Sequence, residues 1–515
     1  MKSVFCLFVL VLMTVVAFSQ PFCGGRPLSV RKAMPVLREV CQLPSRQQLA
    51  KCDFGGFSGN ADAFAVPLAT DLNPCNSGQW ETVDDKRVWR LAISSPNAYS
   101  LNLTFSDFVL PPGAELFLYN SDTTQIVGAF SSDNNAEVLP TIPIVGDVVY
   151  VEYVEPADVE FQGFFNIVQV AHDFKGAFSA DTASLSECQV DVNSELGADW
   201  QDEKRAVCRI LVNGTTLCTG TLLNTANQSF EPYVLTARHC ISSERQAQNS
   251  IFYFNYEDEQ SEKQYVAGST LVASKDNDNG YLDFALVRLA DVPAEYNAYY
   301  AGWYVGDSQL DMGVCIHHPN GNAKMLAVDF DSLRVASYRY FDKETFWNVA
   351  EWDVGTTEQG SSGAPLFNSD HKVVGILAGG DADCSYPMND YFQMLSVCYD
   401  RYDFDSLQLA HWLNPEGKPL TSVSGACRPT GIELESSPAQ IGIYPNPAQS
   451  HVEIFAEKPI GYVSICTMLG NAVMRFDAKA RQTVTIDIAN LRQGLYVCQV
   501  FFADGYFANS VIVKE

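Results

Sequence analysis

The sequence predicts an all-β protein of several domains, on three observations. Short runs of β-branched and aromatic residues, such as YSLNLTF, AELFLYN and DVVYVEYVE, alternate with turn signals such as LPPG and SDNN. Aromatic residues make up 12% of the chain, which favours pleated sheets over helix bundles. At 515 residues the chain exceeds what one core usually supports, since domains commonly hold about 100–200 residues.

Residues 1–19 are expected to form a signal peptide that is removed after export. Lys2 supplies a short positive start, a long apolar run follows, and small residues precede Gln20. No later stretch holds about 18 apolar residues in a row, so no membrane-spanning segment is expected. The 14 cysteines left after removal of Cys6 from the total of 15 would then lie in an oxidising compartment.

The formal net charge of −28 argues against binding of nucleic acid, which requires basic faces to displace counterions. It is compatible with a soluble extracellular protein or with a preference for cationic substrates. A solvated acidic surface is the simpler interpretation.

Shifts in composition divide the rest of the chain. Residues 20–175 have the strand-and-turn rhythm of an antiparallel β-sandwich and no catalytic pattern. The polar stretch KGAFSADTASLSE follows, and residues 176–425 hold every motif that carries chemistry. A linker at 426–439 leads to a last β-rich domain, which reads as a β-sandwich at 440–515.

Three segments of the central domain carry candidate catalytic residues. They are YVLTARHC with His239, YLDFALVRL with Asp283, and EQGSSGAPLF with Ser361 and Ser362. A serine hydroxyl is a weak nucleophile that needs an imidazole to take its proton, and the imidazole needs a buried carboxylate to fix its tautomer. Each segment alone is weak, but the order His, Asp, Ser is that of chymotrypsin.

The glycines of the third segment suit an oxyanion hole, which needs backbone N–H groups in a tight turn. Gly360 and Ser362 would supply the two donors, and Gly363 would let the chain pass closely behind the nucleophile. Ser362 stands where the Gly-x-Ser-Gly pattern places the nucleophile, and Ser361 is the second candidate.

Over about 230 residues from Cys188 onward, the chain resembles the lysyl endopeptidases, a bacterial branch of the chymotrypsin-like serine peptidases. The resemblance rests on CTGTLLNTA, YVLTARHC, DFALVRL, AGW, IHHPNG at 316–321, TTEQGSSGAPLF and GGDADCS. It implies a double β-barrel, acyl transfer to water, and His239, Asp283 and Ser362 as the triad. No cofactor is required by this chemistry, and no metal is expected. Pancreatic trypsins have an aspartate at the position of Ser361, which pairs with the new N-terminus. Activation here cannot use that ion pair, and the family bridge at Cys188 would do the equivalent ordering.

The same resemblance implies two disulfides. Cys218–Cys240 would close the loop before His239, and Cys188–Cys384 would tie the start of the peptidase domain to the specificity pocket. The further cysteines Cys208, Cys315 and Cys398 could pair among themselves or remain buried thiols.

Substrate specificity is expected to come from a carboxylate in the segment CSYPMNDYFQ. The trypsin pocket position is Thr356 here, whereas the lysyl endopeptidases use a downstream Asp, best matched by Asp390. Asp381 and Asp383 are competing acids, and a surface turn is the alternative role for Asp390. The rest of the pocket would be lined by Ala378, Gly379 and Gly380, with Ala378 at the position of a family histidine.

Two further patterns could suggest metals. His317 and His318 are adjacent, so on a strand they point to opposite faces, and KDNDNG at 275–280 lacks the terminal Glu of a calcium loop. Structural roles are favoured for both.

The last domain resembles the sorting domain of type IX secretion cargo, known from Bacteroidetes. The similarity lies in IYPNP at 443–447, with Tyr-Pro-Asn-Pro opening the first strand, and in the closing NLRQGLYVCQV and SVIVK. It implies export through the type IX machinery, with the product secreted or retained at the cell surface. A generic adhesion module is the alternative, and Cys466 and Cys498 could form a bridge.

The sequence thus predicts a secreted serine endopeptidase with an N-terminal propeptide that cuts proteins and peptides after basic residues, Lys or Arg. The same triad with another specificity, and an adhesin or pseudoenzyme that kept the barrel, are the alternatives. Lys175, the single basic residue of an exposed and mobile linker, would be the processing site, cut by the enzyme itself or by another protease.

Overall fold

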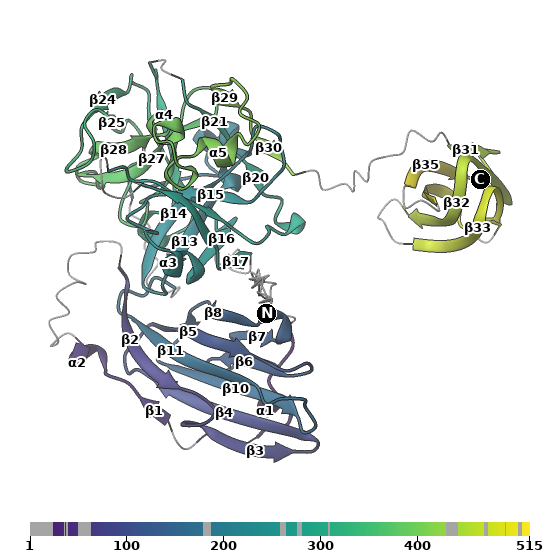
Figure 1. Ribbon diagram of the computed structural model, residues 1–515, viewed down its shortest axis with the longest axis horizontal. Coiled ribbons are helices and arrows are strands. Elements are labelled where there is room, and N and C mark those ends of the chain that lie inside the picture. Colours follow the sequence, from purple (N-terminus) through teal and green to yellow (C-terminus); the bar gives the residue numbers. More distant parts are fainter. Residues whose placement is uncertain are drawn as a thin grey trace, which may run out of the picture. The chain divides into compact units, whose positions relative to one another are not determined.

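The computed structural model describes residues 24–34, 37, 40–49, 63–178, 187–257, 264–275, 281–306, 309–428, 441–467, 472–489, 491–502 and 507–515. It forms two compact units, residues 1–428 and 429–515 (Figure 1). The first unit contains the N-terminal and central domains, and the second contains the last domain. The expected signal peptide and most of the linker at 426–439 lie outside the described residues.

The N-terminal domain is a sandwich of two β-sheets. One sheet has the order β1 (Val40–Gln42), β4 (Lys86–Ser94), β10 (Val148–Pro156), β6 (Glu115–Tyr119) and β7 (Ile126–Phe130), with β3 (Gln79–Val83) also paired to β4. The other has the order β2 (Ala65–Leu72), β11 (Phe164–Asp173), β5 (Ser100–Val109) and β8 (Ala136–Pro140), with β9 (Ile144–Val145) on β5. Pairing is antiparallel except between β1 and β4. The short helix α1 (Leu28–Arg31) precedes β1, and the short helix α2 (Arg46–Leu49) lies between β1 and β2 in the chain.

An aromatic cluster fills this sandwich. The Phe165 ring, fully buried on β11, lies 5.4 Å from the rings of Trp89 and Tyr153 and 5.7 Å from that of Phe105. Strand alternation explains the arrangement, because Phe165 points inward while its neighbour Phe164 points to solvent and is 43% exposed.

The central domain consists of two curved sheets that form the double β-barrel (Figure 1). The first has seven strands in the order β17 (Tyr265–Ala267), β16 (Ser250–Phe254), β13 (Val207–Val212), β14 (Thr216–Leu223), β15 (Tyr233–Thr236), β19 (Ala285–Arg288) and β18 (Thr270–Ser274), and α3 (Glu244–Gln248) precedes β16.

The second sheet runs β12 (Val190–Asp191), β23 (Met325–Asp329), β22 (Gly313–His317), β26 (Pro365–Phe367), β27 (Lys372–Gly380), β28 (Met388–Met394), β25 (Phe346–Glu351) and β24 (Arg334–Ala336). β21 (Gly302–Tyr304) pairs with β27 and with β29 (Ser422–Val423). Helices α4 (Leu395–Asp400) and α5 (Ala410–Leu413) follow β28. One core cluster contains residues of both sheets, including Leu222, Phe252, Ile316 and Ile376.

The N-terminal sandwich contacts the first barrel directly. Phe64 and Ala171 share an apolar cluster with Leu211, Ile251 and Tyr253 of the barrel. The Phe64 N–H donates to Thr215 O at 2.9 Å, and the Gln169 amide donates to Asn213 O at 2.7 Å. The two domains therefore share apolar surface as well as a covalent link.

The central domain extends slightly beyond its expected end at residue 425. Strand β30 (Ala426–Cys427) pairs with β20 (Tyr299–Tyr300), so residues 426–427 belong to this fold rather than to the linker. Among the described residues, no helix is long and apolar enough to cross a membrane.

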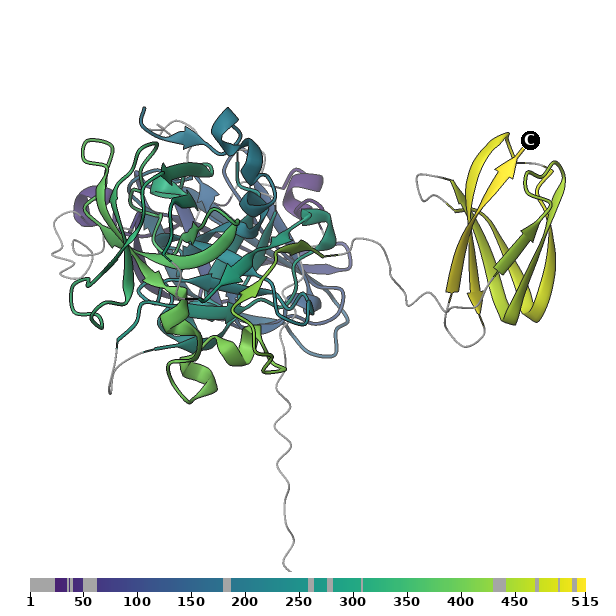
Figure 2. The same ribbon diagram turned by 90° about the horizontal axis from the view of Figure 1, so that it is seen from above.

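The last domain is built on strand β32 (His451–Thr467), which pairs with β31 (Ile441–Tyr444), β33 (Ala472–Asp487) and β34 (Gly494–Phe502), and β35 (Phe507–Lys514) completes the sheet. Register shifts in β32 between Phe455 and Tyr462 let its two halves contribute to different pairings, and the strands surround one core (Figure 2). The expectation that Tyr-Pro-Asn-Pro opens the first strand is wrong. β31 ends at Tyr444, because Pro445 has no N–H to donate to a neighbouring strand.

Replacing Phe165 by alanine is expected to lower the free energy of unfolding of the N-terminal domain by about 3–5 kcal/mol, the cost of emptying a buried aromatic site. Phe164→Ala, on the exposed side of the same strand, is the matched control and should change it by less than about 1 kcal/mol. Calorimetry of the full chain, made inactive to prevent autolysis, measures both. Equal losses would contradict the assignment of the two faces.

Candidate active site

His239 and Asp283 are brought together by two paired strands. His239 follows β15 and Asp283 precedes β19, and these strands pair with Thr236 opposite Ala285. The His239 Nδ1 atom lies 2.7 Å from Asp283 Oδ2, and the His239 backbone N–H donates to Oδ1 at 3.0 Å. Asp283 is 1% exposed. This geometry can fix one imidazole tautomer and stabilise an imidazolium.

Ser362 lies where the two barrels meet. Its carbonyl oxygen accepts a hydrogen bond from Thr219 N–H of β14 at 2.8 Å, and the next residue, Gly363, donates to Leu377 O of β27 at 2.8 Å. Cys240, which directly follows His239, has its sulfur 3.6 Å from the same Ser362 carbonyl. The nucleophile candidate and the base candidate are therefore neighbours across this junction.

The two serine candidates differ sharply in environment. The Ser361 side chain is fully buried, and its Oγ lies 2.8 Å from His317 Nδ1 and accepts the Glu358 N–H at 3.2 Å. Ser362 is partly accessible. A nucleophile must reach substrate, so the geometry favours Ser362.

Gly360 and Gly363 have left-handed backbone conformations, with φ of 87° and 85°. A Cβ atom on Gly363 would lie 2.2 Å from Thr236 Oγ1, and one on Gly360 would lie 2.9 Å from Gly321 N. Only glycine fits at both positions. The resulting tight turn presents backbone amides around Ser362, as an oxyanion hole requires.

Asp390, the predicted pocket carboxylate, is deeply buried. It belongs to β28, opposite Gly380 of β27, and is 1% exposed. Its Oδ2 atom accepts hydrogen bonds from Trp352 Nε1 at 2.8 Å and Thr357 Oγ1 at 2.6 Å. Burial raises the pKa of Asp390 to about 6 despite these bonds.

The other predicted pocket residues lie beside this carboxylate. Ala378, Gly379 and Gly380 are half-buried at the end of β27, and a Cβ on Gly380 would lie 2.2 Å from Asp390 Oδ1. The competing acids Asp381 and Asp383 are exposed, and Asp383 accepts the N–H groups of Ser385 and Tyr386 in its own turn. The geometry favours Asp390, and the surface-turn alternative does not fit its burial.

Residues 183–393 match the family model described as lysyl endopeptidase, C-terminal domain, and residues 442–514 match the secretion system C-terminal sorting domain. The chain contains a lysyl endopeptidase domain. It is a serine endopeptidase, exported by means of a type IX sorting domain to the cell surface or the medium.

A curated lysyl endopeptidase of Pseudomonas aeruginosa is 26% identical over 357 residues, covering 63% of this chain and 76% of that protein. Among solved structures, the protease Rv3671c of M. tuberculosis in an inactive form is 17% identical, with a TM-score of 0.28, covering 41% of this chain and 89% of its own. A Glu endopeptidase structure is 16% identical, with a TM-score of 0.29, covering 41% and 92%.

The lysyl endopeptidase domain contains both disulfides that the resemblance implies, Cys188–Cys384 and Cys218–Cys240. Cys208, Cys315 and Cys398 are buried thiols rather than bridges, and burial raises the pKa of Cys208 to about 12. The Cys466 side chain lies outside the described residues, so its bridge to Cys498 stays a prediction.

The predicted processing site is exposed on one side of the bond only. Lys175 is exposed as expected, but Gly176 is buried, contrary to the expectation of an exposed linker. Both N–H groups are bound by the buried Asp173 carboxylate, at 2.9 and 2.7 Å. The Lys175 ammonium donates to Gln359 Oε1 at 3.4 Å, next to the candidate oxyanion loop. Because the Asp173 carboxylate accepts hydrogen bonds from the N–H groups of Lys175 and Gly176, residues 173–176 form a tight turn. Residues 179–186 of the same stretch lie outside the described residues.

Three supporting residues escaped the sequence analysis. Trp352 and Thr357 hold Asp390, and Gln393 accepts the Asp283 N–H at 3.0 Å. Their partners are 33 or more residues away in sequence, so no local pattern marked them. For Thr357, the only available signal was its place in TTEQGSSGAP.

Among the described residues, no cluster of His, Cys, Asp or Glu has the arrangement of a metal site. KDNDNG lies mainly outside them.

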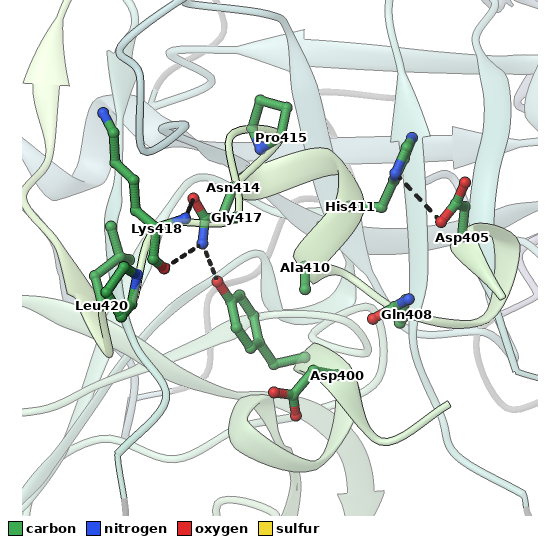
Figure 3. Close-up of a pocket in the computed structure, with 12 residues that line it drawn as sticks. Asp400, Asp405, Gln408, Ala410, His411, Asn414, Pro415, Gly417, Lys418 and Leu420 are labelled. Atoms are coloured by element: carbon green, nitrogen blue, oxygen red, sulfur yellow. Dashed lines mark hydrogen bonds and ion pairs between the residues drawn. The ribbon is translucent and has the colours of Figure 1, made fainter. Parts of the chain in front are cut away.

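A cavity of about 460 Å³ lies over α4 and α5, between Tyr399 and Leu420 (Figure 3). Of its lining residues, Asn414 donates hydrogen bonds to Tyr399 Oη and Lys418 O, and His411 pairs with Asp405. No predicted catalytic or pocket residue lines it.

Ser362→Ala is expected to lower kcat by roughly three to six orders of magnitude without changing the unfolding midpoint, because it removes the attacking oxygen. Ser361→Ala should lower kcat by no more than roughly a hundredfold, since it only alters the loop behind the nucleophile. Active-site titration and peptide hydrolysis measure both. The opposite ranking would make Ser361 the nucleophile.

Proposed function

We propose that the chain hydrolyses peptide bonds on the carboxyl side of basic residues, with lysine as the preferred residue. Ser362 attacks the scissile carbonyl, and His239 takes the serine proton and then delivers it to the leaving amine. Asp283 holds the His239 ring through the 2.7 Å contact, and water then hydrolyses the acyl-enzyme. The backbone N–H groups of Gly360 and Ser362 stabilise the oxyanion.

The observation that carries the specificity is the burial of Asp390. A carboxylate that is 1% exposed and has its pKa raised to about 6 lacks the stabilisation that water would give its charge. An ammonium or guanidinium group entering the pocket restores that stabilisation, whereas a neutral or acidic side chain leaves the charge unpaired. Gly380 has no side chain, so its backbone can pass close to the Asp390 carboxylate, where a Cβ atom would lie 2.2 Å from Oδ1.

The alternatives predict different outcomes. A pseudoenzyme or adhesin would not react with a fluorophosphonate. The His239–Asp283 contact and the accessible Ser362 support an active enzyme instead. A peptidase with acidic or small-residue specificity would react, but a peptide library would show no enrichment of Lys or Arg before the cleaved bond. The library is the decisive experiment for the specificity.

Asp390→Asn should lower kcat/KM for lysine substrates by roughly 2–5 kcal/mol in transition-state binding, or about 30- to 5,000-fold. Substrates with neutral residues before the bond should lose much less. Asp381→Asn, at an exposed neighbouring acid, is the matched control and should lose little. Hydrolysis of paired Lys and Leu peptides measures the difference, and equal loss on both would leave Asp390 a structural residue.

The unfolding midpoint of Asp390→Asn distinguishes loss of the pocket charge from misfolding of the variant. Because the folded-state pKa of Asp390 lies above the ordinary carboxyl value, ionising it destabilises the folded enzyme as pH rises through about 6. The neutral amide of Asp390→Asn avoids that cost. Its unfolding midpoint at about pH 8 should therefore equal or exceed that of the wild type, with the difference vanishing below about pH 4.

We also propose that the N-terminal domain is a propeptide that the enzyme removes by cutting Lys175–Gly176. The Asp173 carboxylate accepts hydrogen bonds from the N–H groups of both residues of this bond and so holds them in a turn. A peptide must be extended to enter an active site, so this turn has to open before cleavage. Cleavage there leaves Ala177 and Phe178 on the peptidase side.

N-terminal sequencing of the secreted protein should find Gly176 first in wild type and an uncut chain in Ser362→Ala. Asp173→Ala should speed the appearance of this terminus, because it releases the turn. Ser100→Ala, which removes only the bond from Ser100 to the same carboxylate, should have a smaller effect. A Gly176 start in Ser362→Ala would assign the cut to another protease.

A further inference from the structure

His317 is a fully buried residue at the end of β22 that the catalytic steps do not use. Its Nδ1 atom lies 2.8 Å from the hydroxyl oxygen of Ser361, the residue directly before the nucleophile. Burial lowers the pKa of His317 to about 3, so the ring is neutral under all conditions in which the enzyme would work. A neutral ring can either accept the serine proton or donate its own.

The Ser361 hydroxyl joins this ring to the turn that carries the oxyanion amides. It accepts the Glu358 N–H at 3.2 Å, and the Ala364 N–H donates to Ser361 O at 2.9 Å. The hydroxyl is thus bonded both to the start of the 358–364 turn and to β22. Movement of the Ser361 side chain would shift the neighbouring backbone, including the amide of Ser362.

The residues after His317 also support the same turn. Asn320 N–H donates to Gln359 O, and the Asn320 side chain donates to Glu358 Oε2 at 3.0 Å. Gly321 N lies where a Cβ on Gly360 would clash. Residues 317–321 therefore form a support behind residues 358–362, and His317 provides its side-chain hydrogen bond to Ser361.

We infer that His317 is a positioning residue, which holds Ser361 so that the amides of Gly360 and Ser362 point at the developing oxyanion. This inference rests on the proposed function. It explains how the 358–364 turn can be ordered without an ion pair at position 361. Ser361 is uncharged and His317 is neutral, so the contact does not depend on a newly formed N-terminus.

The test compares His317→Leu, which keeps an apolar side chain but loses the bond, with His317→Asn, whose amide can reach the Ser361 hydroxyl. The readout is the rate at which a fluorophosphonate labels Ser362 in the full-length enzyme, because this reaction uses the oxyanion hole but not the specificity pocket. His317→Leu and Ser361→Ala should each lower the labelling rate and kcat roughly ten- to a hundredfold with little change in KM. His317→Asn should restore most of the rate.

The double variant His317→Leu/Ser361→Ala should lose no more than the worse single variant, since both remove the same contact. His172→Leu, in the N-terminal sandwich, is the matched control. Its ring is equally buried and its Nδ1 atom lies 2.8 Å from Ser95 Oγ, so the variant should lower the unfolding midpoint without lowering the labelling rate of the folded enzyme.

Binding of a small amidine, which needs only the pocket, should be the same in all variants. Equal labelling rates for wild type, His317→Leu and Ser361→Ala would overturn the inference. A wild-type enzyme that is not labelled at Ser362 would instead overturn the proposed function.

Discussion

The space between the two barrels at Ser362 constrains the whole active site. A Cβ atom on Gly363 would lie 2.4 Å from Thr219 O, and one on Gly360 would lie 2.9 Å from Gly321 N. The turn must therefore be glycine-rich and must contact the first barrel on one side and residues 317–321 on the other. Because Thr219 donates to Ser362 O, and Cys240 is bound to Cys218, the same close approach also brings His239 toward the nucleophile.

Two buried aspartates lie in this small region with opposite electrostatic requirements. Asp283 meets the His239 imidazole and backbone N–H, so its charge has a partner before substrate arrives. Asp390 accepts hydrogen bonds from neutral donors, among them Trp352, Thr357 and the backbone N–H of Ala382. These bonds do not offset its desolvation, so its pKa is raised to about 6. One carboxylate is thereby suited to orient a catalytic group, and the other to attract a cation. The excess of acidic residues, with a net charge of −28, favours approach of the same kind of substrate.

The fold class could be predicted from the sequence, because it depends on the alternation of strand and turn signals along the chain. The triad of His239, Asp283 and Ser362 could be proposed only from the order of three segments that are each weak alone, and the structure brings the first two side chains into contact. Cysteine pairing followed only from the family resemblance, and the structure contains both bridges. Nothing local shows that Trp352 donates to Asp390, 38 residues later, or that His317 meets Ser361, 44 residues later. The buried turn at Gly176 was missed because Lys, Gly and Ser suggested a linker, while the Asp173 carboxylate that orders it lies on the preceding strand.

The connection between the first two domains is part of the support behind the active site. Arg209 of β13 is fully buried, with its guanidinium 4.2 Å from the Phe178 ring centroid and 4.5 Å from that of Tyr256. Its Nε atom lies 3.6 Å from the Cβ position of Gly321, in the segment that supports the 358–362 turn. Removing Phe178 would uncover this guanidinium and admit water behind Gly321, since the ring supplies both its cover and a cation–π contact. The proposed cut before Gly176 would leave Phe178 covalently attached to the peptidase domain, and with it the aromatic cover of Arg209. It would remove Phe64, whose ring centroid lies 5.4 Å from that of Phe178, so this part of the cover would change when the sandwich leaves.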